Sequence, residues 1–211
     1  MALSARPANK LLEARAQDAP TAEVSFDLGM STLQVDLSGS GVDGPAGMLP
    51  WPVIETIAAD DHGCFEIVSA EPRRLQCMSS MTGRLASLYA TDGPPALLLS
   101  GTLMHRIKGV HPGQDTQLKL APLGRLSAFR VLDTATGLGY TSIEARRRGA
   151  LSVHTTELDP AVVDLQRRNP WSQELFRDDQ IVCDTGDIAV EIERFEEDQF
   201  DRILHAGAAG G

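Results

Sequence analysis

A strand–glycine–helix–strand pattern constrains the fold of this 211-residue chain more than any other feature of its sequence. The apolar stretch Phe129–Thr134 ends in a carboxylate and leads into Gly137-Leu138-Gly139, after which helical spacing runs from Tyr140 to Arg148. The next apolar stretch, Leu151–Glu157, also ends in a carboxylate. Strands that alternate with short helices predict a parallel sheet built from right-handed βαβ units.

The same alternation continues on both sides of this pattern. Helices are predicted over 112–120, from the Asp159-Pro160 cap to Asn169, and after Asp187, and further strands over 180–184 and 200–205. We therefore expect an α/β fold in which residues 112–211 form a Rossmann-like domain containing four strands.

The preceding region has a different texture. Short segments of apolar and polar alternation predict a small β-rich domain over residues 23–111, with strands at 23–28, 32–37, 64–68, 74–78, 84–89, 96–99 and 103–107 and one helix within 52–60. Residues 1–22 are assigned to a flexible N-terminal tail, with a short helix or an organelle-targeting segment as alternatives. They lack the apolar core of a secretory signal.

Two glycine loops compete as a nucleotide-binding site. Residues 39–44, Gly-Ser-Gly-Val-Asp-Gly, match the dinucleotide fingerprint, but Pro45, Pro50 and Pro52 follow at once. The fingerprint requires a helix N-terminus to hold the pyrophosphate, so we interpret this loop as a flexible turn between strands.

The second loop, Gly137–Gly139, has the right context but lacks the third glycine of the fingerprint. Glu157 ends the next strand 18 residues beyond Gly139, where a carboxylate can accept hydrogen bonds from a ribose diol. Absence of the third glycine disfavours a pyrophosphate and permits a nucleoside ligand without phosphate.

Charge and cysteine content exclude several classes. The net charge of −10 falls wholly between Thr155 and Asp201, which disfavours a basic nucleic-acid binder, although basic residues between 106 and 130 leave nucleic acid open. The three cysteines form no C-x-x-C, so we expect no metal site and a reducing, cytoplasmic location. No apolar run approaches the roughly 18 residues of a membrane span.

Four segments carry a resemblance to known proteins: residues 100–116, 132–141 (LDTATGLGYT), 157–160 (ELDP) and 169–176 (NPWSQELF). They resemble class I S-adenosylmethionine-dependent methyltransferases. More narrowly, the chain resembles a family of predicted methyltransferases known from archaea and related to the spermidine synthases, over roughly residues 31–205.

The resemblance implies roles for particular residues. It implies that residues of the first βα loop and its flanks line the methionine and ribose portion of S-adenosylmethionine: Asp133, Thr134, Gly137, Gly139 and Tyr140. Glu157 would bind the ribose hydroxyls, and Leu158 would lie against adenine. Asp187 would accept the adenine amino group, with a plain helix N-cap as the alternative.

A second group of residues lies just before the nucleotide-binding unit. His105, Arg106 and Lys108 would pair with the cofactor carboxylate or an acidic substrate group, with ordinary surface charges as the alternative. The catalytic residue and the methyl acceptor, small or macromolecular, are not identified by the sequence, and oligomerisation is left open.

The resemblance implies methyl transfer, with a sheet of seven strands in the family. Only four are counted here, and residues 206–211 (Ala-Gly-Ala-Ala-Gly-Gly) contain no functional side chain, so we expect a C-terminally truncated chain without its acceptor half. Aminopropyl transfer is an alternative, disfavoured because Thr134-Ala135-Thr136 lacks an acidic residue. A non-catalytic interaction module is a further alternative.

Overall fold

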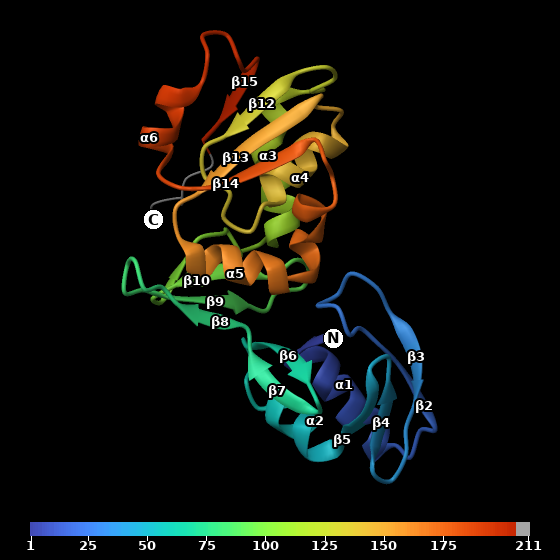
Figure 1. Ribbon diagram of the computed structural model, residues 1–211. Helices are drawn as coiled ribbons and strands as arrows, with labels where there is room; N and C mark the ends of the chain where they lie inside the picture. The colour runs from blue at the N-terminus through green and yellow to red at the C-terminus, as the bar shows by residue number, and fades with distance from the viewer. Residues whose placement is uncertain (206–211) are drawn as a thin grey trace. The chain divides into compact units, whose positions relative to one another are not determined.

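The computed structural model describes residues 1–205, which form a mixed α/β fold of two compact units (Figure 1). Unit 1 comprises residues 1–75 and 88–95, and unit 2 comprises residues 76–87 and everything from 96 onward. The glycine- and alanine-rich segment 206–211 lies outside the described residues.

Unit 1 contains seven short strands and two helices. They are β1 (Ala2–Ser4), α1 (Ala5–Ala16), β2 (Thr21–Val24), β3 (Leu33–Asp36), β4 (Gly41–Gly44), β5 (Gly47–Pro50), α2 (Trp51–Ala58), β6 (Cys64–Val68) and β7 (Glu71–Arg74). The strands make antiparallel pairs, with β1, β6 and β7 in one sheet and two separate hairpins, β2–β3 and β4–β5.

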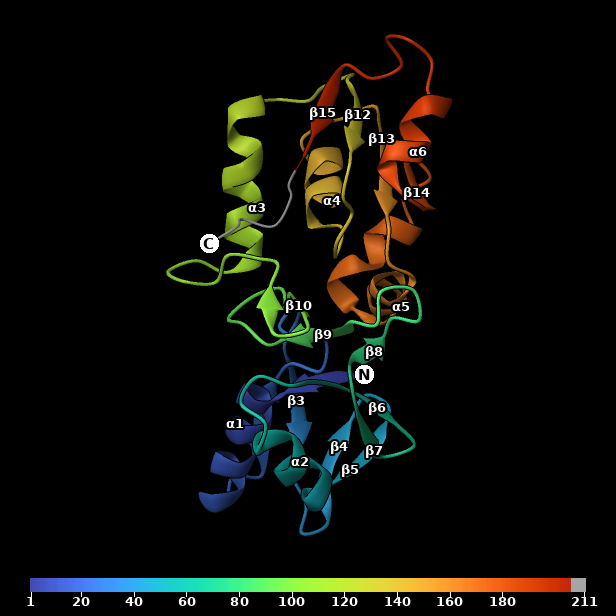
Figure 2. The ribbon, with the colours of Figure 1, turned by 90° about the vertical axis from the view of Figure 1, so that its left-hand side faces the viewer.

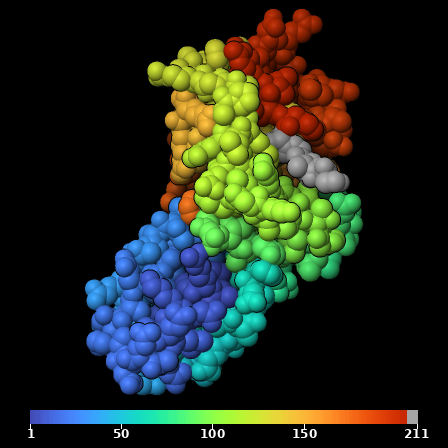
Figure 3. Space-filling view, turned by 180° about the vertical axis from the view of Figure 1, so that it is seen from behind, coloured from blue at the N-terminus to red at the C-terminus, as the bar shows by residue number. Residues whose placement is uncertain are grey.

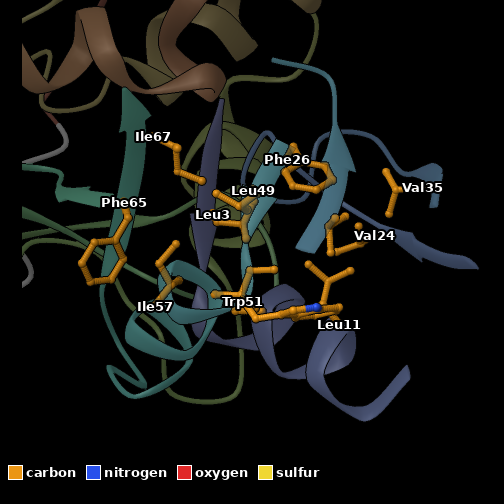
Figure 4. Packing of buried hydrophobic residues seen from close by; sticks show 13 residues of the cluster. Leu3, Leu11, Val24, Phe26, Val35, Leu49, Trp51, Ile57, Phe65 and Ile67 are labelled. Carbon is orange, nitrogen blue, oxygen red and sulfur yellow. The ribbon is translucent and has the colours of Figure 1, made fainter. Parts of the chain in front are cut away.

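The prediction of a flexible tail over residues 1–22 is wrong, and the short helix kept as its alternative is present as α1. Ala5, Ala8 and Leu11, one turn apart, bury one face of α1, and β1 pairs with β6 in a register that sets Leu3 opposite Phe65. Leu3 and Leu11 lie in the core of unit 1 (Figure 4). The tail is ordered by a partner strand some 60 residues away in sequence, which local composition does not reveal.

Residues 41–44 of the loop at 39–44 form β4 of the β4–β5 hairpin, which corrects the prediction of a flexible turn. Gly41 pairs with Pro50 and Val42 with Leu49, whose side chain is fully buried. A Cβ on Gly41 would lie 2.2 Å from the carbonyl oxygen of Leu49, so glycine is required by the close approach of two strands. This requirement accounts for Gly41 without any ligand.

Unit 2 is built around a parallel sheet of order β14-β13-β12-β15 (Figure 2). Its elements are α3 (Pro112–Leu120), η1 (Ala121–Leu123), β12 (Arg130–Asp133), α4 (Tyr140–Arg147), β13 (Ser152–Glu157), α5 (Pro160–Arg168), η2 (Pro170–Phe176), β14 (Ile181–Thr185), α6 (Ile188–Glu191), η3 (Ile192–Arg194) and β15 (Arg202–Leu204). The helix predicted over 112–120 and the four parallel strands are confirmed.

The hydrophobic core of unit 2 lies between this sheet and helices α3 and α4. Val131, Val153 and Ile181 occupy adjacent register positions and pack with Leu120 and Ile143 from α3 and α4. β13 and β14 lie on one side of β12, whereas β15, the next strand in the chain, lies on the other side. The strand order therefore switches beside β12. Such a switch point is where open α/β sheets bind ligands, beyond the carboxyl ends of the strands.

The boundary between the units differs from the predicted division at residue 111. A second, antiparallel sheet of order β11-β10-β9-β8 contributes most of its residues to unit 2; its strands are β8 (Gln76–Met78), β9 (Leu85–Tyr89), β10 (Ala96–Leu99) and β11 (Thr102–Leu103). The Thr82 hydroxyl donates to Asp159, 2.9 Å away, which joins the β8–β9 turn to the start of α5. The strand predicted over 103–107 ends at Leu103.

Among residues 1–205, no helix is both long and apolar enough to cross a bilayer. In the same range, no three His, Cys, Asp or Glu side chains converge as metal ligands would.

Candidate functional site

A cavity of about 170 Å³ lies in unit 2 beyond the carboxyl ends of β12 and β13. Its walls come from β10 and the segment after it, from α3, from the first βα loop and the start of α4, from the end of β13 and from α5. The lining residues are Leu97, Leu99, Met104, His105, Thr116, Lys119, Ala135, Thr136, Gly137, Tyr140, Thr141, Glu157 and Val162. Three of the predicted cofactor residues are among them: Gly137, Tyr140 and Glu157.

The two glycines of the loop have different functions. Gly137 has φ +54° and nothing within 4 Å of the place where a Cβ would stand, and it lines the cavity. Gly139 has φ +80°, and a Cβ there would lie 2.2 Å from a methyl carbon of Leu175. Gly139 is therefore required by the packing of Leu175 against the start of α4, whereas Gly137 borders the open space of the cavity.

Glu157 closes the loop from the neighbouring strand. One carboxylate oxygen accepts a hydrogen bond from the Gly137 amide at 2.8 Å, and the other accepts from the Asp159 amide at 3.0 Å. Burial raises the pKa of this carboxyl group, and the amide hydrogen bonds oppose that shift. The Leu158 amide also donates to this carboxylate, which still has a lone pair with which to accept a hydroxyl hydrogen.

Asp133 does not line the cavity as predicted. Its side chain is fully buried, and its carboxylate accepts hydrogen bonds from the hydroxyls of Thr141 and Ser142. Burial raises its pKa. A buried carboxylate without hydrogen bonds would be costly, so these two hydroxyls are needed to stabilise it. Their hydrogen bonds connect the first turn of α4 to the end of β12.

Tyr140 and the Asn169-Pro170-Trp171-Ser172 segment form one buried network. The Asn169 side-chain amide donates to the Tyr140 hydroxyl at 3.0 Å and to the Ser172 hydroxyl at 2.8 Å. Ser172 in turn donates to the Leu138 carbonyl at 2.8 Å. Through the hydrogen bond of Ser172 to Leu138, this segment supports the glycine loop, a role that the sequence motif does not reveal.

Thr134 lies at the switch point, outside the cavity lining. Its hydroxyl is 2.7 Å from a ring nitrogen of His205, and its amide donates to the Leu204 carbonyl at 2.9 Å. Thr134 thus connects the ends of β12 and β15.

Leu158 and Asp187 are both exposed and do not line the cavity. Leu158 is 49% exposed, which leaves an apolar surface beside Glu157. Asp187 is exposed and caps α6 by accepting from the Ala189 amide at 2.9 Å, so the helix N-cap that we had kept as its alternative is present. Its contact with adenine stays a prediction.

His105 lines the cavity as a neutral imidazole. Its Nδ1 accepts from the Leu97 amide at 3.1 Å, and its ring lies 5.4 Å from that of Tyr140. Burial, and then the charge of Lys119, lower its pKa to about 4. At neutral pH it is therefore not the cation that would pair with a carboxylate, although its other nitrogen can donate a hydrogen bond.

Arg106 and Lys108 are exposed and do not line the cavity. The cation that does so is Lys119 on α3, which the sequence analysis did not select. Lys119 follows Asp115 by one helical turn and pairs with it, a spacing that could have drawn attention to it.

Comparisons with known proteins show which fold this chain resembles. No protein-family profile matches the chain. An uncharacterised protein from Methanocaldococcus jannaschii is 35% identical over 161 residues, which are 76% of this chain and 54% of that relative. The chain therefore spans about half the length of the curated relative that it matches.

Two solved spermidine synthases are similar in structure. One, in complex with the transition state analogue AdoDATO, gives a TM-score of 0.51 at 18% identity over 62% of this chain and 46% of that chain. The other, from Thermotoga maritima, gives 0.51 at 18% identity over 67% and 53%. At this level of identity the similarity is one of fold, and the chain has a spermidine synthase-like fold.

Proposed function

We propose that unit 2 binds S-adenosylmethionine and that the protein uses it as a methyl donor. The observation that carries this proposal is the position of Glu157. Its carboxylate ends β13, accepts from the Gly137 amide and lines a cavity beyond the carboxyl ends of β12 and β13. A carboxylate at that position can accept both hydroxyls of a ribose.

The residues around the cavity fit a nucleoside that has no phosphate. Gly137 leaves open space, Glu157 supplies acceptors, and exposed Leu158 supplies an apolar surface for a base. The enclosed volume of about 170 Å³ is below the roughly 300–1,000 Å³ of most ligand pockets. We therefore assign the ribose and amino-acid portion to the cavity and the adenine to the open surface beside Leu158.

When bound, S-adenosylmethionine supplies a methyl group on a positively charged sulfur, which is already a good leaving group. Residues of this chain then have to hold and orient the cofactor and need no acid–base step for departure. Neutral His105 suits this task because it places no positive charge beside the sulfonium. The acceptor is not assigned.

Cofactor binding is the part of this proposal that the chain itself can test, since it spans about half of its archaeal relative. Isothermal titration with S-adenosylmethionine should give saturable binding. Glu157→Ala should weaken it by about 1.5–3 kcal/mol, roughly 10- to 150-fold, because charged hydrogen bonds are lost. Glu193→Gln, which alters an exposed acid, is the matched control.

Binding that is unchanged in Glu157→Ala would refute the assignment of the ribose. Absence of binding to any adenosyl compound by the wild type would instead favour a non-catalytic interaction module.

Aminopropyl transfer is the second candidate, favoured by the similarity in fold to two spermidine synthases. That reaction would use decarboxylated S-adenosylmethionine. Tight binding of the decarboxylated compound alone would overturn methyl transfer and support this candidate.

A further inference from the structure

An ion pair in the wall of the cavity has no part in the contacts of Glu157 or Gly137. Lys119 and Asp115 lie one turn apart on α3, with Nζ 2.9 Å from a carboxylate oxygen. The Asp115 side chain is 8% exposed and that of Lys119 is 30% exposed, and only Lys119 lines the cavity. The helix itself lies at the surface of unit 2 (Figure 3), so a lysine could have pointed into solvent.

The charges around the cavity make Lys119 distinctive. Among the described lining residues it is the single cation, since His105 is neutral at pH 7, and Glu157 is the single anion. These two charges come from different elements, α3 and β13. The contact with Asp115 is an ion pair by distance and not a hydrogen bond. A lysine has three N–H donors with which to bind a ligand.

We propose that Lys119 is the binding site for the carboxylate of the cofactor's amino-acid portion, with Asp115 as the residue that positions its ammonium group in the cavity. This inference rests on the proposed function, which places a ribose at Glu157. It makes the cavity selective for adenosyl compounds that carry an α-carboxylate over decarboxylated ones, and it names the discriminating residue.

The selectivity follows from desolvation. A carboxylate that meets Lys119 in the cavity gains a charge-assisted hydrogen bond away from bulk water. A decarboxylated ligand has no carboxylate to pair with Lys119, and it brings only positive charges toward the lysine. A site built around a polar group rejects analogues that lack the complementary group more strongly than it rejects a missing methylene.

A purely structural role is the competing explanation, because acid and lysine four residues apart stabilise many helices by a few tenths of a kcal/mol. The two explanations differ in which ligands respond. A structural lysine affects all adenosyl ligands alike, whereas a carboxylate site affects only those that contain a carboxylate.

The experiment measures dissociation constants by isothermal titration for S-adenosylmethionine, S-adenosylhomocysteine, decarboxylated S-adenosylmethionine and 5′-methylthioadenosine, which has no amino-acid group. Lys119→Met should weaken the two carboxylate-bearing ligands about 10- to 100-fold and leave 5′-methylthioadenosine within about twofold. Lys119→Arg should retain most of the preference. Lys10→Met, a change at an exposed lysine of unit 1, is the matched control.

Each outcome decides. Equal weakening of all four ligands, or no weakening of any, overturns the carboxylate site and leaves the ribose at Glu157 standing, as does a wild type that prefers the decarboxylated compound. A wild type that binds none of the four, including 5′-methylthioadenosine, refutes the proposed function and this inference with it. Asp115→Asn removes the charge that positions the ammonium group, so it should reduce the carboxylate preference and leave 5′-methylthioadenosine unaffected; an unchanged preference would refute the positioning role of Asp115.

Discussion

The two glycines of the loop after β12 should respond differently to the same substitution. Gly139→Ala places a Cβ at φ +80° and 2.2 Å from Leu175, which is 3% exposed and cannot move aside freely. The left-handed backbone costs an alanine about 1–2 kcal/mol, and overpacking adds about 1–3 kcal/mol. The free energy of unfolding of unit 2 should therefore fall by about 2–5 kcal/mol.

Gly137→Ala meets no atom within 4 Å and should lose only the backbone part, about 1–2 kcal/mol. Its Cβ enters the space proposed for the ribose, so its larger effect should be on the affinity for S-adenosylmethionine. One substitution should chiefly destabilise the unit, and the other should chiefly impair binding.

Equilibrium urea unfolding can measure both variants. Each unit contains one tryptophan, Trp51 in unit 1 and Trp171 in unit 2, so a Trp51→Phe background reports unit 2 by the fluorescence of Trp171. With a slope of about 1–3 kcal/mol per molar urea, a loss of 3 kcal/mol lowers the midpoint by roughly 1–3 M.

The contact with Leu175 is tested by a double-mutant cycle. In a Leu175→Ala background, Gly139→Ala should cost only the backbone part, because the clashing side chain is gone. Equal destabilisation by Gly137→Ala and Gly139→Ala, or an additive cycle, would refute the separation of roles.

Three further predictions concern pH and the adenine surface. The pKa of His105 is about 4 in the folded protein and about 6.5 in the unfolded chain, so on acidification the unfolded state takes up the proton first. Unit 2 should therefore lose about 2 kcal/mol of stability between pH 8 and pH 5. In urea titrations the His105→Gln variant, which lacks this group, should lose about 2 kcal/mol less over the same range. Because burial raises the pKa of Glu157 above 4.5, affinity for S-adenosylmethionine should begin to fall above pH 4.5 on acidification in calorimetry, and a Glu157→Gln variant with the same acid loss would contradict this. Asp187→Ala should weaken S-adenosylmethionine about tenfold and its inosine analogue little, since only adenine has the amino group that the carboxylate would accept; equal weakening would leave the helix cap as the sole role of Asp187.

Local patterns predicted the frame of unit 2 well. The helix over 112–120, the four parallel strands and the helix caps at Asp159 and Asp187 depend on residues close in sequence, and each was predicted from them. The glycine loop and Glu157 were found together because a βαβ unit brings consecutive strand ends to one edge.

What the sequence did not reveal depends on distant contacts. Asp133 can be buried because hydroxyls on the next helix donate hydrogen bonds to its carboxylate. Position 139 requires glycine because the side chain of Leu175, 36 residues away, packs against it. The first strand depends on β6, and the cavity cation comes from α3 rather than from the Arg106–Lys108 segment. A pattern of residue types indicates that charge is present near a site, whereas packing decides which side chain enters it.

Amide chemical shifts on titration with S-adenosylhomocysteine test the central claim most directly. The loop of residues 39–44 serves as the internal control, because Gly41 belongs to a hairpin in unit 1. The amides of Gly137 and Asp159, both bonded to the Glu157 carboxylate, should shift in a saturable manner while that of Gly41 stays fixed. Shifts centred on residues 39–44, or saturable binding that leaves Gly137 and Asp159 unchanged, would contradict the assignment of the site.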